Sequence, residues 1–229
     1  MYKAAPPQRP ADRAYAWIRD RIFAGDFAPR AHLKEEDLAR RIGVSRSPVR
    51  DALRRLAGEG MVVAERERGT YVKEFSRAEI DEIFQLRAAL EAYAAALAAQ
   101  RIEPAALARL EALAGKMQAI RQSGEAAFAR FSALNNDFHR TVLAAAKSPR
   151  LESLLDPLLS IPVFLLKHYN WRPEQVDIQR SNVEHRELMD ALRARDAVWA
   201  RTRMHAHIIS RRPRYSNGEP AAVAPLDVL

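Results

Sequence analysis

Residues 38–56, LARRIGVSRSPVRDALRRL, decide the fold of the N-terminal part of this chain. The run 42–45 in the middle is short and contains glycine, as the turn of a helix-turn-helix motif requires. Ser45, the last residue of that run, is a good N-cap for a helix that follows it. The stretch therefore predicts two helices, residues 34–42 and 45–59, joined by a tight turn.

The sequence on either side of this stretch completes a larger motif. Apolar residues at i, i+3 and i+4 spacing predict a preceding helix that stops at Gly25. Downstream, residues 61–64 and 70–72 are two β-prone runs around a charged turn that contains Gly69, which predicts a hairpin. Three helices followed by a hairpin is the order of a winged helix-turn-helix.

The predicted helix at residues 45–59 has two faces of different chemistry. Its apolar stripe can pack on the other two helices and consists of Val49, Leu53 and Leu56. Its guanidinium stripe is turned elsewhere and consists of Arg46, Arg50 and Arg54. A major groove accepts one α-helix, and arginine can bind guanine or clamp phosphates there. We expect Arg66 and Arg68 at the hairpin tip to contact the minor groove or the backbone. The alternative is a salt-bridged surface helix.

The sequence pattern after Phe75, as far as residue 211, predicts only helices. Breaks in the pattern divide this part into six helices, at residues 76–102, 104–122, 125–146, 149–170, 173–194 and 196–211. Pro157 and Pro162 are expected to kink the fourth of these. The fold class is therefore mainly α, with a winged helix-turn-helix followed by an all-helical bundle. The expected divisions are a flexible arm at 1–10, a DNA-binding domain at 11–74, a helical domain at 76–211 and a disordered tail at 213–229.

Composition restricts the class of protein. The formal net charge is +8, and residues 1–72 carry 15 Lys and Arg against 10 Asp and Glu, a surplus of 5. This uneven balance points to a polyanionic partner for the N-terminal part. The absence of cysteine excludes disulfide scaffolds and thiolate metal sites. No apolar run is long enough to cross a membrane and no signal peptide is recognisable, so we expect a cytoplasmic protein with no membrane partner.

Three histidines on three predicted helices lie on inward-looking faces: His139, His185 and His207. Imidazoles suit zinc, nickel, copper or iron, and a helical bundle is a common place for such a site. From spacing alone, separate core histidines remain the better interpretation. Arg87 also lies within an apolar stripe, where a guanidinium needs an anionic partner. That partner is either Glu91, one turn along the helix, or the carboxylate of a bound effector.

The N-terminal motif resembles the winged helix of GntR-family bacterial transcription regulators. The resemblance covers residues 38–56, 59–62 and 68–72, in order. It implies operator contacts from the recognition helix and from the wing, at Ser45, Arg46, Ser47, Arg50, Arg68 and Gly69. The arginine stripe and the hairpin tip add Arg54 and Arg66 to the residues that we predict to contact DNA.

The helical part is similar to the FCD effector domain of the FadR subfamily of these regulators, and its six helices favour the VanR-type branch. The motifs that carry this similarity are residues 134–139, 184–192 and 196–208. In metal-binding members an acidic residue and three histidines hold a divalent ion, which implies Asn135, His139, His185 and His207 here. Asn135 stands where the common residue is aspartate. The resemblance also implies a small carboxylic acid as effector, held by Arg87.

The hypothesis is therefore a homodimeric, ligand-responsive repressor that binds double-stranded operator DNA and is not an enzyme. The expected cofactor is a divalent metal, zinc first, with nickel, manganese or iron as alternatives. The competing hypotheses are a metal-dependent hydrolase and an architectural DNA-binding protein with a structural metal. Of the aromatic residues, we expect packing in the core from Tyr93, Phe131, Phe164 and Trp199.

Overall fold

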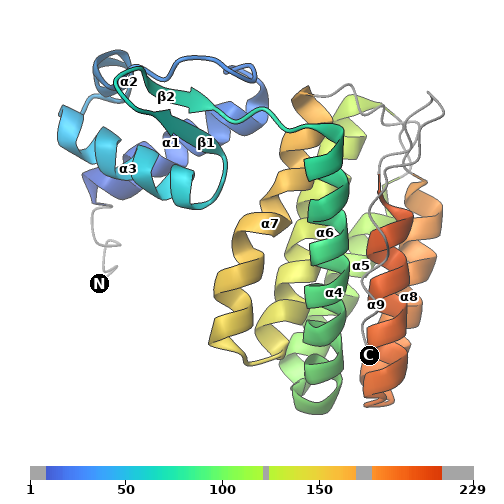
Figure 1. The fold of residues 1–229 in the computed structure, drawn as a ribbon. Helices are drawn as coiled ribbons and strands as arrows, with labels where there is room; N and C mark the ends of the chain where they lie inside the picture. The colour runs from blue at the N-terminus through green and yellow to red at the C-terminus, as the bar shows by residue number, and fades with distance from the viewer. Residues whose placement is uncertain (1–8, 121–123, 169–176, 213–229) are drawn as a thin grey trace, which may run out of the picture. The chain divides into compact units, whose positions relative to one another are not determined.

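The computed structural model describes residues 9–120, 124–168 and 177–212. The chain divides into two compact units, mainly between Glu74 and Phe75, and of the later described residues 163–168 are grouped with the first unit. The first unit consists of three helices and a hairpin (Figure 1). Their bounds are α1 (Pro10–Ala24), α2 (Glu35–Ile42), α3 (Arg46–Gly58), β1 (Val62–Glu65) and β2 (Gly69–Val72). This order confirms the predicted winged helix-turn-helix.

The turn between α2 and α3 has the conformation that the sequence predicts. Gly43 ends α2 with φ at +73°, in the left-handed region that glycine enters without a steric penalty. Ser45 occupies the N-cap position of α3, as predicted, but its side chain accepts no hydrogen bond from the helix. The Ser45 hydroxyl is therefore not committed to capping the helix.

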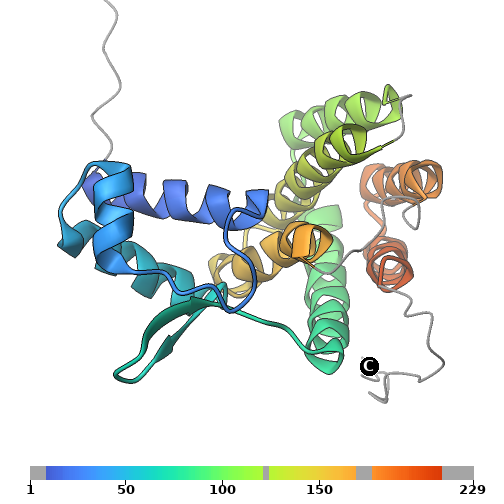
Figure 2. The same ribbon diagram turned by 90° about the horizontal axis from the view of Figure 1, so that it is seen from above.

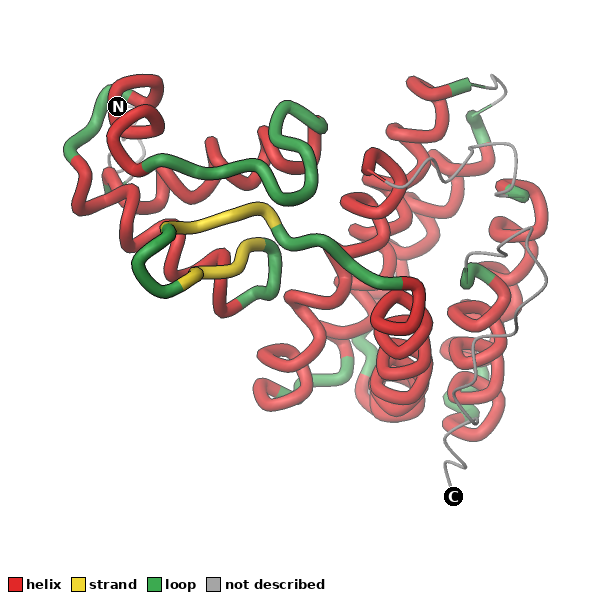
Figure 3. The backbone as a smooth tube through the Cα atoms, turned by 45° about the horizontal axis from the view of Figure 1, so that its top comes forward, coloured by secondary structure: helices red, strands yellow, loops and turns green. Residues whose placement is uncertain are grey.

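The wing is a two-stranded antiparallel hairpin, drawn in yellow in Figure 3. Val62 pairs with Val72 at its base, and Glu65 pairs with Gly69 next to the turn. His32 forms a bridge to Tyr71, and its ring stacks on the Tyr71 ring at 4.7 Å. A Cβ on Gly69 would lie only 2.4 Å from Nε2 of His32, so this close approach requires glycine at that position.

The apolar stripe of α3 packs as predicted. Val49, Leu53 and Leu56 are all buried, and α3 packs on α1, α2 and β1. Burial of these three side chains is what holds α3 in place, since its other face carries charges that stay in water. One boundary differs: α1 begins at Pro10, inside the segment predicted as an arm, because proline is well tolerated in the first turn of a helix. The rest of that arm, at residues 1–8, lies outside the described residues.

The second unit starts at Phe75 and is entirely helical in the part that is described. Its helices are α4 (Arg77–Arg101), α5 (Pro104–Gln118), α6 (Glu125–Ala145), α7 (Pro149–His168), α8 (Ile178–Arg193) and α9 (Ala197–Ser210). These correspond one to one to the six predicted helices. Helix α7 runs without a break across Pro157 and Pro162. The predicted start of the fifth helix at residue 173 lies outside the described residues, as does the predicted tail at 213–229.

Three packed pairs organise this unit. Helix α4 packs along α9, α5 packs on α6, and α8 packs on α9. Figure 2 shows α8 and α9 side by side. Phe84, Leu110 and Phe138 are among the largest side chains buried in the interior of this unit. No helix in the described ranges combines the length and the apolar character that crossing a bilayer requires.

Two aromatic residues do not lie where the sequence pattern suggests. Tyr93 is 54% exposed and Trp199 is 36% exposed, so the prediction that they are core residues is wrong. Phe131 is buried as predicted, whereas the Phe164 side chain is not among those described. Periodicity places a side chain on a face of its helix, but only the neighbouring helices decide whether that face is covered.

Candidate functional site

The eight residues predicted to contact DNA all lie on the surface of the first unit. They are Ser45, Arg46, Ser47, Arg50, Arg54, Arg66, Arg68 and Gly69. The first five belong to α3 and its cap, and the last three to the wing. The exposed surface of the first unit therefore includes a helix N-terminus and these five guanidinium groups, which suit a phosphate backbone and base edges.

The arginines of α3 have acidic neighbours in the free protein. Arg50 donates two hydrogen bonds to Glu35, from Nε at 3.0 Å and from Nη2 at 2.8 Å. Arg54 lies 3.6 Å from Asp51 on its own helix, and Arg68 lies 3.9 Å from Glu65. Glu35 could not be predicted from the sequence pattern, because a partner 15 residues away on another helix leaves no periodic signal.

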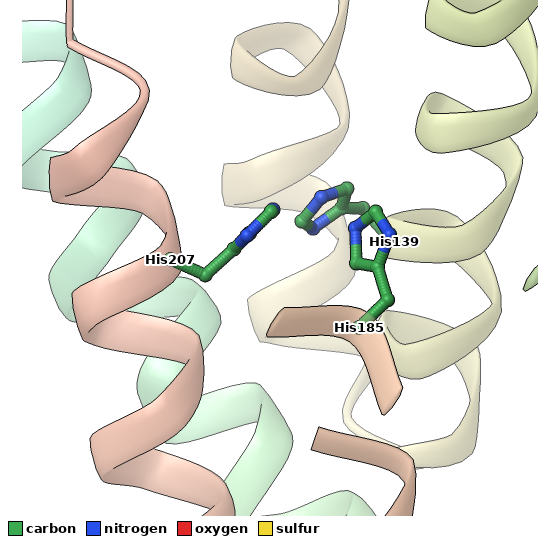
Figure 4. Close-up of side chains that lie close together, drawn as sticks. All are labelled: His139, His185 and His207. Atoms are coloured by element: carbon green, nitrogen blue, oxygen red, sulfur yellow. The ribbon is translucent and has the colours of Figure 1, made fainter. Parts of the chain in front are cut away.

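The three histidines of the second unit converge. His139 comes from α6, His185 from α8 and His207 from α9, and all three side chains are buried. One ligand atom from each lies within 4.8 Å of the other two. Figure 4 shows the three rings gathered between their helices. Three nitrogen atoms at this spacing could coordinate one metal ion.

The ring nitrogens of this cluster are poorly satisfied by the protein itself. Neither nitrogen of His139 or of His185 has a hydrogen-bond partner in the described part of the chain. Asn135 stands one turn before His139 on α6, and its buried Oδ1 also has no partner among the described residues. Buried polar atoms of native proteins are nearly always paired, so these unsatisfied atoms make the histidine cluster a candidate ligand site.

Two carboxylates contact the histidines of the cluster. Glu91 of α4 is buried, and its Oε2 lies 2.7 Å from Nδ1 of His139, although the two are not aligned as a hydrogen bond. Glu184 of α8 accepts a hydrogen bond from Nδ1 of His207 at 2.8 Å. Because a carboxylate only accepts, that bond leaves the lone pair of His207 on Nε2. The role of Glu184 could not be predicted from the sequence pattern, because it lies 23 residues from its histidine.

The protonation states of these groups follow from burial and charge. Burial lowers the pKa of His185 well below its ordinary value, and the neighbouring His207 and His139 lower it further. Burial also lowers the pKa of His207 to about 4, although its bond to Glu184 acts in the opposite direction. His185 and His207 are therefore neutral near pH 7 and keep a free lone pair.

The carboxylates are ionised despite their surroundings. Burial by itself would raise the pKa of Glu91, but the charges of Arg87 and His139 outweigh it and lower that pKa to about 2. Burial by itself would likewise raise the pKa of Glu184. Its hydrogen bond to His207 and the charge of Arg211 outweigh burial and lower that pKa to about 2. Two negative charges thus lie next to a cluster in which His185 and His207 are neutral near pH 7.

Arg87 has the neighbour that the sequence offered as one of two alternatives. Its Nε and Nη2 both lie 2.8 Å from Oε1 of Glu91, and both side chains are buried. Arg87, Glu91 and His139 therefore form a continuous chain of contacts from α4 to α6. His205, two residues before His207 on α9, is exposed.

Known proteins resemble this chain in both units. Residues 10–72 match the gntR family of bacterial regulatory proteins, and residues 82–210 match the FCD domain. The probable D-xylose utilization operon transcriptional repressor of Paenarthrobacter nicotinovorans is 29% identical over 200 residues, covering 86% of this chain and 85% of the relative. The HTH-type transcriptional repressor GlaR of Escherichia coli is 27% identical over 204 residues, with 86% and 91% coverage.

Solved structures show the same fold. E. coli McbR/YncC superposes with a TM-score of 0.72 at 24% identity, over 88% of this chain and 94% of that one. A GntR regulator from Rhodococcus sp. RHA1 gives a TM-score of 0.64 at 22% identity, over 87% and 93%. The FCD match alone spans more than half of the chain, and the gntR match precedes it in the order that the two units have here. The chain therefore belongs to the GntR family of bacterial regulatory proteins and is a transcription regulator with an FCD domain behind its winged helix.

Proposed function

We propose that this regulator is a repressor whose helical unit holds a divalent metal ion and responds to a small carboxylic acid. The observation that carries the proposal is the convergence of three buried histidines, with one ligand atom of each within 4.8 Å of the others. Three buried imidazoles from three helices are a costly arrangement unless something binds them, since among the described residues neither ring nitrogen of His185 nor Nε2 of His139 has a hydrogen-bond partner.

The donor set fits a divalent transition metal. We assign His139, His185, His207 and the Oδ1 atom of Asn135 as ligands, with zinc as the first choice and nickel, manganese or iron as alternatives. Glu184 supports the assignment because it holds Nδ1 of His207 and leaves Nε2 as the ligating atom. Asn135 adds no charge, so the ionised Glu91 and Glu184 supply the negative charge behind the site.

Arg87 is the residue that we assign to the effector. Its Nε and Nη2 share one oxygen of Glu91, which leaves Nη1 as the nitrogen for a second carboxylate. A bound metal would supply a Lewis-acidic position for the same carboxylate. A buried guanidinium binds a carboxylate strongly, because little water competes for its donors.

The proposal includes a homodimer on double-stranded operator DNA. A helix-turn-helix normally reads two half-sites as a two-fold dimer. Helix α4 carries an apolar stripe with exposed members at Leu86 and Tyr93, and α7 exposes Leu154. Large apolar side chains left in water on one unit favour a second copy of this chain as the partner. A DNA-binding regulator acts where the chromosome is, so we place the protein in the cytoplasm.

The repressor role is proposed by analogy with two relatives, the probable D-xylose utilization operon repressor and the repressor GlaR. Binding of the acid would shift the population between arrangements of the helical unit and so change operator affinity.

Elemental analysis tests the metal site. The purified protein should carry about one divalent ion per chain after dialysis against zinc, and His185→Ala should lose most of it. His205→Ala is the matched control, since this exposed histidine lies on the same unit and should leave metal content unchanged. Full occupancy in His185→Ala, or no binding by the native chain, would contradict the site.

Thermal unfolding in the presence of candidate acids tests the sensor. An effector should raise the unfolding temperature of the metal-loaded protein and change its affinity for operator DNA. Turnover of esters, amides or phosphates that His139→Ala abolishes would instead favour the hydrolase. Failure of every acid in both assays would favour an architectural DNA-binding protein.

A further inference from the structure

Glu35 connects two arginines of the recognition helix. It is the first residue of α2, and both of its oxygens bind Arg50 of α3, Oε1 to Nε at 3.0 Å and Oε2 to Nη2 at 2.8 Å. Oε2 also lies 3.6 Å from Nη2 of Arg46. Glu35 is the more buried partner, with 26% of its side chain exposed against 50% for Arg50. A half-buried carboxylate thus accepts two hydrogen bonds from one side of an exposed guanidinium.

These two hydrogen bonds determine which edge of the Arg50 guanidinium remains available to a partner. A guanidinium has a side-on fork, formed by Nε and one Nη, and an end-on fork, formed by the two Nη atoms. Glu35 occupies the side-on fork. The end-on fork therefore faces away from Glu35, and its two parallel donors match the O6 and N7 acceptors that guanine presents in the major groove.

We propose that Glu35 is a specificity-determining residue of this DNA-binding unit. It holds Arg50 in the orientation that reads guanine, and its negative charge weakens binding to phosphates when no guanine is in place. The inference rests on the proposed function in one respect, the assignment of α3 as the helix that reads DNA.

A purely structural role explains this contact poorly. Ion pairs with this much exposure contribute little to folding stability. Arg54 gives the matched comparison: it lies on the same stripe, but its acidic neighbour Asp51 is on its own helix at 3.6 Å and does not grip it bidentately.

Selection from a library of randomised DNA duplexes measures the effect. The native chain and the variants Glu35→Gln, Asp51→Asn and Arg50→Ala are each used as full-length protein to select sequences. Asp51→Asn is the charge-matched control, because it removes one negative charge from the same surface without releasing Arg50. We expect the native chain and Asp51→Asn to select the same guanine-containing half-site. Glu35→Gln should select a half-site in which one guanine position has become degenerate.

Titrations at fixed salt with the selected duplex and with a mixed-sequence duplex give the second readout. The ratio of specific to non-specific affinity should fall roughly fivefold or more in Glu35→Gln relative to Asp51→Asn, because a good bidentate base contact discriminates by at least that factor. Glu35→Ala, which offers no acceptor, should lose at least as much. Circular dichroism should show the same helical content in every variant.

The outcomes separate the two claims. If Arg50→Ala selects the same half-site as the native chain, α3 is not the reading helix and the proposed assignment fails. If Arg50→Ala loses the guanine while Glu35→Gln matches Asp51→Asn in both readouts, the reading helix stands and the role of Glu35 is overturned.

Discussion

The two units each contain an arginine–glutamate pair with the same closest distance and opposite surroundings. Arg50 and Glu35 in the winged helix lie 2.8 Å apart with 50% and 26% of their side chains exposed. Arg87 and Glu91 in the helical unit also lie 2.8 Å apart, with 5% and 4% exposed. Distance alone would describe them as equal, but water competes with the first pair and not with the second.

This difference in burial corresponds to a difference in role. An exposed guanidinium can exchange its carboxylate for a phosphate or a base at little cost, since both states are hydrated. A buried one cannot give up its partner unless another anion takes its place. The winged helix is therefore suited to a large polyanion that approaches from solvent, and the buried pair of the helical unit is consistent with the small acid that we propose as its effector.

The largest expected effect is the loss of folding stability when the buried Arg87–Glu91 pair is disrupted. Arg87→Met should lower the free energy of unfolding by about 3–5 kcal/mol, because it leaves the ionised Glu91 buried without its cation. Urea denaturation followed by circular dichroism measures this. The double variant Arg87→Met with Glu91→Leu should recover much of the loss, since no buried charge remains. A loss below about 1 kcal/mol in the single variant would make the two pairs equivalent.

The buried histidines predict a pH dependence that exposed groups would not produce. The pKa of His207 is about 4 in the folded protein and near 6.5 in an unfolded chain, so between these values only the unfolded chain binds the proton. The free energy of unfolding of the metal-free protein should therefore fall as the pH drops from about 6.5 to 4, by roughly 3 kcal/mol from His207. His185 contributes in the same direction.

Urea titrations at a series of pH values check this dependence. The lowered pKa values of Glu91 and Glu184 act in a separate window, because their stabilisation is lost only below about pH 4.5. His207→Leu should flatten the decline above pH 4.5, while His205→Gln should leave it unchanged. A stability that is constant between pH 6.5 and 4.5 would contradict the burial of neutral histidines.

The exposed pair should matter for DNA more than for folding. Arg50→Ala should weaken specific operator binding by roughly 1–3 kcal/mol, because it removes one bidentate base contact. Fluorescence anisotropy at fixed salt measures this. Arg203→Ala removes one exposed cation from the helical unit and serves as the control. Equal losses in the two variants would indicate a general charge effect.

The smallest effect concerns the folding of the winged helix itself. Glu35→Ala should change the free energy of unfolding by less than about 1 kcal/mol, in line with other exposed ion pairs. Thermal unfolding of this variant beside Arg87→Met sharpens the contrast between the two surroundings. A loss as large as that of Arg87→Met would show that Glu35 is needed for folding.

The local pattern predicts much of this molecule. The turn at Gly43, the buried stripe of α3 and the six helices of the second unit follow from glycine, proline and apolar spacing, which act over a few residues. The inward faces of His139, His185 and His207 follow from the same periodicity. A neighbour three or four positions away is fixed once the helix forms, so these features need no knowledge of the fold.

The contacts between helices were decided by the tertiary structure. Glu35 meets Arg50, Glu91 meets His139 and Glu184 meets His207 across 15 to 48 residues of chain. Periodicity also failed for Tyr93 and Trp199, which are exposed although their helices carry apolar residues. The sequence by itself determined which face of each helix a residue occupies. Which face meets which, and hence which charges are buried together, depends on the packing of several helices at once.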